Sequence, residues 1–154
     1  MPGKNLLLTA ALVIAALVFA LGGTAGSLAG AQEASDLSVA ERGAIRKVIE
    51  SQLEAFRRDD AAGAFAFASP KIQEIFGDPA TFMAMVQAGY QPVYRPRRFA
   101  FQDLKELRGQ PAQEVFFVGP DGKEVLGIYV MDRQPDGRWR IDGVFLIKPE
   151  DSGA

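Results

Sequence analysis

Two copies of the tripeptide Pro-Asp-Gly, at 120–122 and 135–137, separate short apolar segments near the end of the chain. In such a turn proline fixes φ, aspartate hydrogen-bonds its own backbone, and glycine supplies a positive φ. The flanking segments have the two-residue apolar period of strands. Tight turns join antiparallel neighbours, so the pattern predicts a consecutive antiparallel meander. The expected strands are 93–102, 113–118, 124–132 and 138–147.

The residues before Tyr90 have a helical period instead. Ser38, with Glu41 three residues later, forms the capping box that begins a helix, and the apolar spacing behind it predicts an amphipathic helix over 38–58. Three shorter helices should follow: one capped by Asp59-Asp60, with Phe65, Ala66 and Ala68 facing inward; one over 71–76; and one opened by Asp78-Pro79, with Phe82, Met83, Met85 and Val86 on its apolar side. Helices followed by strands predict an α+β fold, with the helices packed on a curved antiparallel sheet of four or more strands.

The first 31 residues differ in composition from the rest. Lys4 precedes an uncharged apolar run from Leu6 to Leu21, and small residues follow as far as Ala31. This order is typical of a signal peptide. The alternative is an uncleaved membrane anchor, although the run is shorter than the roughly 17 residues that a spanning helix needs. We predict a signal peptide over 1–31, a linker over 32–37, one domain over 38–148 and a flexible tail over 149–154. The domain would then be periplasmic or secreted, and would meet a membrane only if the N-terminal segment is retained.

Composition excludes several kinds of chemistry. The chain has no cysteine and no histidine, which rules out thiol catalysis and thiolate metal sites and removes the commonest general base. The net charge is −2, with both signs mixed along the chain, so a nucleic-acid partner is not expected. The aspartates lack the spacing of a calcium loop. We expect no metal and no cofactor.

The predicted sheet is apolar on both faces. In the third strand, Val125, Tyr129 and Met131 alternate with Leu126, Ile128 and Val130; in the fourth, Trp139, Ile141, Phe145 and Ile147 are expected to oppose Val144 and Leu146. A sheet with one wet face should alternate between apolar and polar side chains. We therefore expect a second copy to cover the second face, giving a homodimer through the sheet. The alternative is a sheet that curls over itself.

Several segments resemble an uncharacterised bacterial family, domain-of-unknown-function family 4864. The most specific are Asp59-Asp60 before the FAFASP run, Phe82 to Val86, Tyr90 to Pro96, and Trp139 to Gly143. The resemblance covers roughly 45–146 and implies no activity. A looser resemblance is to the nuclear transport factor 2-like superfamily, which implies helices folded against a curved sheet as a cone with an apolar pocket. That fold is shared by isomerases, dehydratases and non-catalytic domains, so it implies no single function.

Candidate site residues follow from the polar groups that such a pocket could enclose. We expect a ligand pocket formed by Gln52, Tyr90, Tyr94, Arg95, Tyr129 and Trp139, for a small apolar or acidic ligand. Arg95, Arg97 and Arg98, with Arg133 nearby, form either an anion site or a charged strand edge. Without histidine, acid–base catalysis would need an aspartate and a tyrosine, and Tyr129 with Asp142 is the candidate pair. The simpler interpretation makes Tyr129 a core residue and Asp142 a solvated one.

Three functions remain open from the sequence. The first is non-catalytic binding of a small ligand, or a protein interaction, through a cone-like apolar pocket. The second is an acid–base enzyme of isomerase or dehydratase type. The third is a structural, envelope-associated dimer. A carboxylate and a tyrosine within hydrogen-bond reach in one cavity would favour the enzyme.

Overall fold

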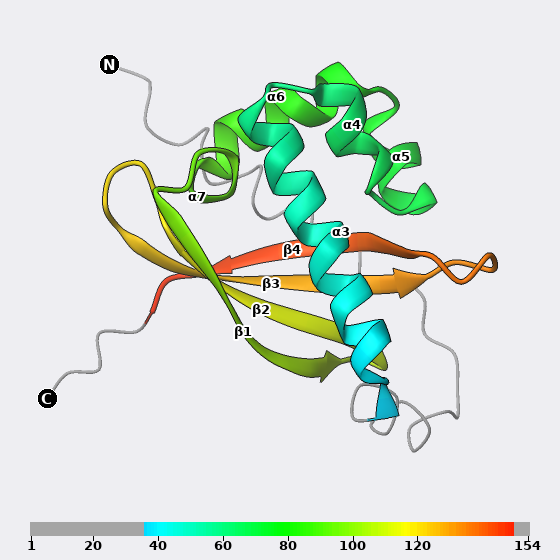
Figure 1. Ribbon diagram of the computed structural model, residues 1–154. Helices are drawn as coiled ribbons and strands as arrows, with labels where there is room; N and C mark the ends of the chain where they lie inside the picture. Colours follow the sequence, from blue (N-terminus) through cyan, green and yellow to red (C-terminus); the bar gives the residue numbers. More distant parts are fainter. Residues whose placement is uncertain (1–35, 150–154) are drawn as a thin grey trace, which may run out of the picture.

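The computed structural model describes residues 36–149 (Figure 1). The predicted signal peptide, residues 32–35 of the predicted linker and the tail after Pro149 lie outside these residues. The elements are α3 (Val39–Arg57), α4 (Ala61–Ala66), α5 (Pro70–Phe76), α6 (Pro79–Gly89), α7 (Gln91–Tyr94), β1 (Arg98–Leu107), β2 (Gln110–Val118), β3 (Glu124–Arg133) and β4 (Trp139–Ile147).

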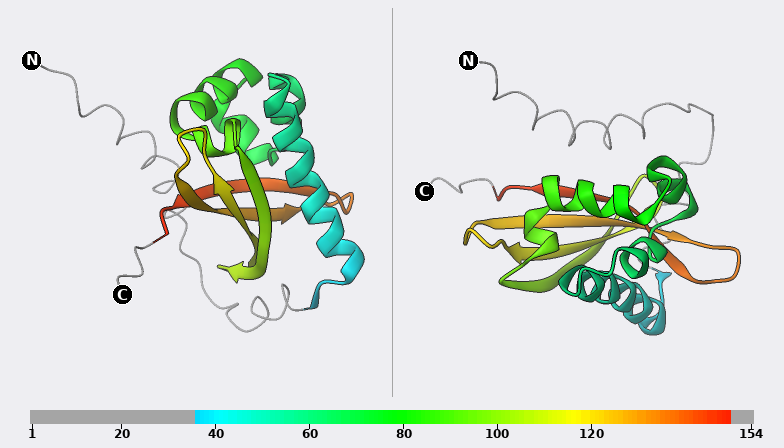
Figure 2. Two further views of the ribbon diagram at one scale, coloured as in Figure 1. Left: turned by 60° about the vertical axis from the view of Figure 1, so that its left-hand side comes forward. Right: turned by 90° about the horizontal axis from the view of Figure 1, so that it is seen from above.

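The α+β fold class is confirmed. The four strands form one antiparallel sheet in the order β1-β2-β3-β4, which is the predicted meander. Helix α3 crosses one face of the sheet, helices α4, α5 and α6 group on the β4 side, and α7 lies near the start of β1 and the end of β2 (Figures 1 and 2). Residues 67 and 69 extend the sheet at that side, because Ile141 exchanges backbone hydrogen bonds with Phe67 and Ser69, each 2.8 Å long.

Side-chain caps begin the helices where the sequence predicts. Ser38 and Glu41 form the reciprocal capping box of α3. Asp60 accepts a hydrogen bond from the Gly63 N–H at 2.8 Å, and Asp78 caps α6 in the same way. Each acceptor satisfies an N–H that has no partner within the helix. The prediction that Ala66 faces inward is wrong, because this residue is exposed.

The predicted first strand is misplaced by five residues at each end. Its first residues form helix α7, because Pro92 lies in the first turn of a helix, where its missing N–H costs nothing. Pro96 has no N–H for a ladder, and pairing with β2 is established only at Arg97, whose N–H donates to the Val118 carbonyl at 2.8 Å. The far end of β1 turns at Arg108 and Gly109, which have φ values of 53° and 82°. Arginine is not among the usual residues for such a turn, so the position of this turn was not predicted.

A β-bulge in β4 changes which side chains share a face. Tyr129 lies opposite Val144, whereas Met131 lies opposite Ile141, so β4 carries one extra residue between these pairs. Asp142 is that residue. The bulge reverses the alternation, as extra residues do. Val144 and Leu146 therefore pack toward the core with Ile141, and the prediction that Phe145 and Ile147 share the Ile141 face is wrong.

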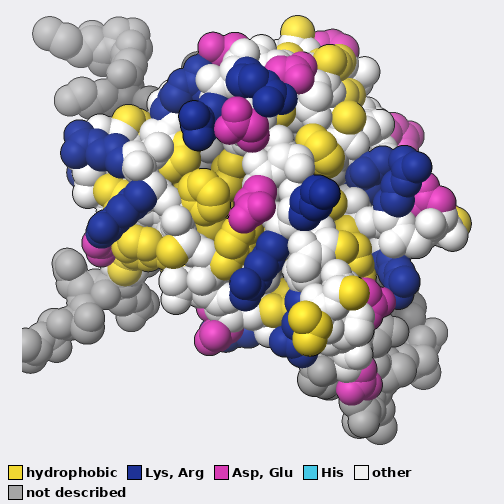
Figure 3. Space-filling model, viewed as in Figure 1, with side chains coloured by type: hydrophobic (Ala, Val, Ile, Leu, Met, Phe, Trp, Pro, Cys, Tyr) yellow, Lys and Arg dark blue, Asp and Glu magenta, His cyan; other side chains and the backbone are white. Residues whose placement is uncertain are grey.

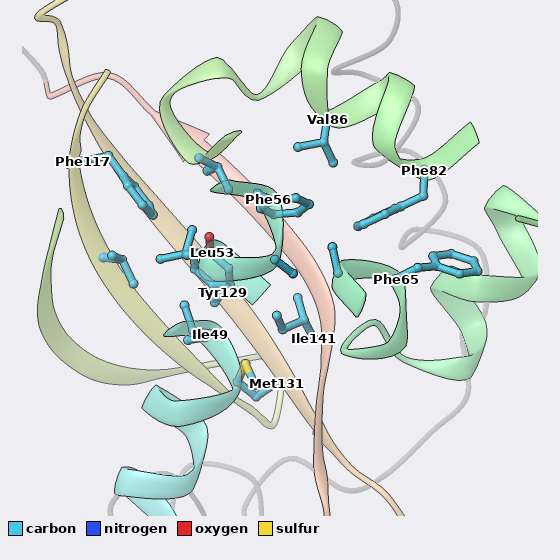
Figure 4. Packing of buried hydrophobic residues seen from close by; sticks show 14 of the residues in the cluster. Ile49, Leu53, Phe56, Phe65, Phe82, Val86, Phe117, Tyr129, Met131 and Ile141 are labelled. Atoms are coloured by element: carbon cyan, nitrogen blue, oxygen red, sulfur yellow. The ribbon is translucent and has the colours of Figure 1, made fainter. Parts of the chain in front are cut away.

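The core lies between α3 and the sheet (Figure 4). Ile49, Leu53 and Phe56 of α3 meet Val115 and Phe117 of β2 and Tyr129 and Met131 of β3, and all of these are buried. A second part of the core joins Phe56 to the shorter helices, since its ring lies 6.1 Å from that of Phe82, which in turn lies 5.3 Å from Phe65. Phe56 thus links the sheet-facing core to the helical cluster.

Candidate functional site

An apolar pocket lies where the helical cluster meets the β4 side of the sheet. It has a volume of about 50 Å³. Helices line one side of it, with Gln52 and Phe56 of α3, Ile72 and Phe76 of α5, Phe82, Met85 and Val86 of α6, and Val93 of α7. The other lining residues are Ile141, Gly143 and Val144 of β4, together with Ala68 before α5 and Tyr90 between α6 and α7. That volume accommodates a few water molecules, so a larger ligand requires movement of side chains at the wall. Met85 and Ile72 are only partly buried, and the flexible thioether of methionine suits such movement.

Only two of these lining residues have polar side-chain groups. Gln52 is 3 % exposed, and its amide donates to the Ala64 carbonyl oxygen at 3.1 Å. The Tyr90 hydroxyl donates to the Val144 carbonyl oxygen at 3.3 Å, and burial raises the pKa of this phenol. The lining contains no aspartate, glutamate, lysine or arginine. The pocket is therefore neutral as well as apolar.

Tyr129 and Asp142 do not hydrogen-bond to each other. Tyr129 is completely buried on the core face, and burial strongly raises the pKa of its phenol. Asp142, at the bulge, accepts a 2.7 Å hydrogen bond from the Ser69 hydroxyl and a 3.3 Å hydrogen bond from the Gln110 amide. The aspartate thus joins the start of α5 to β2 and β4.

Tyr94 and Arg95 lie outside the pocket lining and contact Asp59. The Tyr94 hydroxyl and the Arg95 guanidinium both donate to one carboxylate oxygen of Asp59, the second at 2.8 Å, and the guanidinium lies 4.0 Å from the Tyr94 ring centre. Asp59 has a φ of 55°, a conformation that aspartate tolerates better than most residues. This cluster fixes the turn after α3 against α7.

The other arginines of the predicted cluster are dispersed. Arg97 donates two hydrogen bonds to the Pro120 carbonyl oxygen, at 3.1 and 2.8 Å, and so fixes the β2–β3 turn. Arg98 is exposed on β1. Arg133 pairs with Glu41 at 2.8 Å and lies 5.7 Å from the Trp139 ring centre. The arginines therefore contact three different parts of the domain.

Trp139 lines a second, polar groove at the opposite end of α3. This groove has a volume of about 500 Å³ and is lined by Asp36, Leu37, Glu41, Gly109, Gln110, Pro111, Met131, Asp132, Arg133 and Trp139. Sequence reasoning missed it, because it depends on the unrecognised turn at Gly109. Within residues 36–149, no group of three or more acidic side chains could hold a metal ion.

The face of the molecule in front of the sheet is not fully covered. Hydrophobic side chains gather beside α3 and below α7, over β1 and β2 (Figure 3). Phe99 is 39 % exposed there, and Phe101 and Leu104 are partly buried. The Arg46 guanidinium lies 5.4 Å from the Phe101 ring centre and shields part of this surface.

Acid should weaken the fold through three carboxylates whose pKa values are lowered by hydrogen bonds. Glu41 accepts hydrogen bonds from Ser38, and Asp78 accepts them from Thr81. Asp59 accepts hydrogen bonds from Tyr94, which has the larger effect on its pKa, and from Arg95. A lowered pKa in the folded state adds stability above the unfolded pKa, and that stability is lost as pH falls through the folded value. We expect the melting temperature to fall as pH drops below about 4, near the unfolded values.

This acid dependence can be measured by thermal unfolding between pH 6 and pH 2. The variant Asp59→Asn keeps a side chain that tolerates positive φ but cannot titrate, so its melting temperature should fall less steeply. Equal slopes for the variant and the natural chain would show that Asp59 does not contribute.

No helix among residues 36–149 is both long and apolar enough to span a membrane. A family model described as "Domain of unknown function (DUF4864)" matches residues 38–154, which includes every residue of the apolar pocket. No curated protein and no solved structure matches the chain.

Proposed function

The chain belongs to the domain-of-unknown-function family DUF4864, and from its apolar pocket we propose that it is a non-catalytic domain that binds a small apolar ligand. One observation carries the proposal: a concave site lined almost entirely by apolar side chains, with only Gln52 and Tyr90 to orient a bound molecule. Apolar walls with few polar groups are typical of small-molecule sites. The acidic-ligand alternative has less support, because no cationic side chain lines the pocket.

The acid–base alternative has little support from the geometry. A general base must reach the proton that it removes, directly or through one water. Asp142 does not line the pocket, and its carboxylate oxygens accept hydrogen bonds from Ser69 and Gln110. Tyr129 does not line the pocket either, and its hydroxyl has no hydrogen-bond partner among residues 36–149. Non-catalytic binding is therefore the simpler proposal.

The pocket can be tested by filling it. Met85→Trp places a large side chain at the pocket wall, whereas Ala84→Trp places the same side chain at the exposed neighbouring position on α6. Toluene serves as the probe. A ligand that binds only the folded state raises the melting temperature. We expect toluene to raise it for the natural chain and for Ala84→Trp, and to have no effect on Met85→Trp. Equal effects on both variants would place toluene elsewhere.

A second proposal concerns the sheet face turned away from the core. In register across the strands, this face carries Ala100, Phe116, Leu126, Ile128, Phe145 and Ile147, and none of them joins the helix-covered core. Ile147 is 46 % exposed. The surrounding charges on the same face balance, with Arg98, Lys105 and Arg140 against Glu114, Glu124 and Asp132. Two identical copies can meet there without net repulsion, so we propose a homodimer through this face.

Light scattering tests the dimer. We expect a dimer for the natural chain and a folded monomer for Ile128→Asp, because the substitution places an unpaired charge at the centre of the apolar face. Val39→Asp is the matched control, since Val39 is 88 % exposed on α3, away from this face. A natural chain that is monomeric at micromolar concentration would exclude the dimer.

The proposal also places the domain outside the cytoplasm. It is supported by the composition of residues 1–31, which is typical of a signal peptide. Cell fractionation with N-terminal sequencing tests it. A mature chain beginning at Gln32 supports a cleaved signal peptide, and an intact chain in the cytoplasm contradicts export.

A further inference from the structure

Tyr129 carries a buried hydroxyl that has no hydrogen-bond partner among residues 36–149. Its ring packs against Phe117 with the centres 6.3 Å apart. The hydroxyl oxygen points toward Leu53 and the part of α3 that carries Phe56 (Figure 4). Nearly all buried polar side-chain atoms in proteins are paired, and leaving one unpaired is unfavourable. A partner for this hydroxyl would therefore have to come from outside residues 36–149.

This hydroxyl lies beside the wall of the apolar pocket. Tyr129 does not line the pocket, but Val144, which lies directly opposite Tyr129 on β4, does. Phe56 and Tyr90 line it as well, and the Tyr90 hydroxyl donates to the carbonyl oxygen of Val144. The nearby Tyr90 phenol adds to the effect of burial in raising the pKa of Tyr129. Tyr129 therefore lies next to residues that form the pocket wall, on the side where Tyr90 bonds to Val144.

The absence of charged side chains from the pocket lining limits which molecules can bind next to Tyr129. The lining contains no ionised side chain. Both phenols stay protonated at neutral pH, because burial raises the pKa of each above its ordinary value of 10. Moving an ionised group into such surroundings is strongly unfavourable unless it is paired. A bound molecule should therefore be uncharged where it meets the phenols.

We propose that the pocket takes an uncharged molecule with an apolar body and one hydroxyl or carbonyl group, which pairs with the Tyr129 hydroxyl. This inference rests on the proposed ligand-binding function and specifies its ligand class. Binding requires the side chains around Phe56 and Val144 to part slightly, so that the polar group reaches Tyr129 while the apolar body stays among the phenylalanine rings.

Three probes of similar size separate the effects of apolar contact, of one hydrogen-bonding group and of a negative charge on binding. These probes are toluene, benzyl alcohol and benzoate. Binding can be followed by NMR of the methionine methyl groups in the full chain. Met85 lines the pocket, whereas Met83 and Met131 belong to the buried core outside the lining and serve as internal references. We expect benzyl alcohol to bind about two- to tenfold more tightly than toluene, the factor that one neutral hydrogen bond gives. Benzoate should bind most weakly.

Tyrosine-to-phenylalanine variants assign the hydrogen bond. Tyr129→Phe should bind toluene as well as the natural chain does, but should lose the preference for benzyl alcohol. Tyr94→Phe makes the same chemical change outside the pocket, where the hydroxyl bonds to Asp59, and should keep the preference. Equal binding of benzyl alcohol and toluene by the natural chain would overturn this inference and leave the pocket intact. Failure of both probes to shift Met85 would overturn the proposed function as well.

Stability gives an independent test that distinguishes a ligand from a bound water. After refolding from denaturant to remove bound small molecules, Tyr129→Phe should melt about 2–8 °C higher than the natural chain, because it lacks the unpaired hydroxyl. Tyr94→Phe should melt lower, since it loses a hydrogen bond. An equal or lower melting temperature for Tyr129→Phe would show that the hydroxyl already has a partner, such as a buried water, and would overturn the inference.

Discussion

Replacing Gln113 with alanine should destabilise the domain by about 2–4 kcal/mol. The Gln113 side chain is 1 % exposed, and its amide nitrogen donates to the carbonyl oxygens of Gln102, Asp103 and Glu114 at 2.9, 3.3 and 2.9 Å. Two of these carbonyls belong to the irregular part of β1, where the register with β2 shifts. Alanine would leave them without their donor and would also open a cavity.

Urea unfolding of Gln113→Ala, Gln113→Met and Gln113→Glu measures this effect. Methionine keeps most of the volume but donates no hydrogen bond, so Gln113→Met separates the cavity from the lost donor. Gln113→Glu should be at least as destabilising as alanine, because an ionised carboxylate would face backbone oxygens at a buried position. A loss below about 0.5 kcal/mol for Gln113→Ala, the range of ordinary surface substitutions, would show that the irregular part of β1 does not depend on this amide.

Replacing Phe56 with alanine should cost about 3–5 kcal/mol, the usual range for a buried aromatic. Phe56 is 1 % exposed and joins the sheet-facing core to Phe82. Because Phe56 also lines the pocket, the cavity left by alanine should merge with it. Toluene should therefore restore part of the lost stability, since it binds only the folded state.

Phe76→Ala is the matched control for this cavity. Phe76 also lines the pocket, and its ring centre lies 5.6 Å from that of Phe82, but its side chain is only half-buried. We expect a smaller loss of stability than for Phe56→Ala, because less apolar surface leaves water when Phe76 packs. Urea unfolding with and without toluene measures both variants. An equal loss for the two would contradict the central packing role of Phe56.

Local sequence chemistry accounts for the features that could be predicted. Ser38 with Glu41, and Asp78 before Pro79, begin helices because each side chain bonds to an N–H within the next few residues. The glycines of the two Pro-Asp-Gly turns, Gly122 and Gly137, adopt the positive φ values of 80° and 85° that such turns need. These features depend on few neighbouring residues, so the sequence alone identifies them.

Features that depend on distant residues were missed. The bulge at Asp142 is fixed by Ser69, 73 positions earlier, and by Gln110 on another strand. The period of β4 alone cannot indicate the extra residue, so the faces of Phe145 and Ile147 were assigned incorrectly. Helix α7 replaced the start of a strand because proline is compatible with both a helix start and an edge strand.

In the candidate site, too, some features follow from residue type and others depend on contacts between distant residues. Gln52 and Tyr90 lie in the pocket wall, and Tyr129 lies behind it. Tyr94 and Arg95 contact Asp59 instead, and Trp139 lines the polar groove. Residue type indicated which side chains could act in a pocket. The packing of α5 and α6 against β4 decides which of them share one, and no local pattern encodes that packing.

Native mass spectrometry of the full chain, expressed in its host and purified without denaturation, tests the central claim most directly. The proposed function predicts a small uncharged molecule bound to the natural chain and to Ala84→Trp, and lost from Met85→Trp. No bound mass on the natural chain, or the same mass on Met85→Trp, would contradict ligand binding in this pocket.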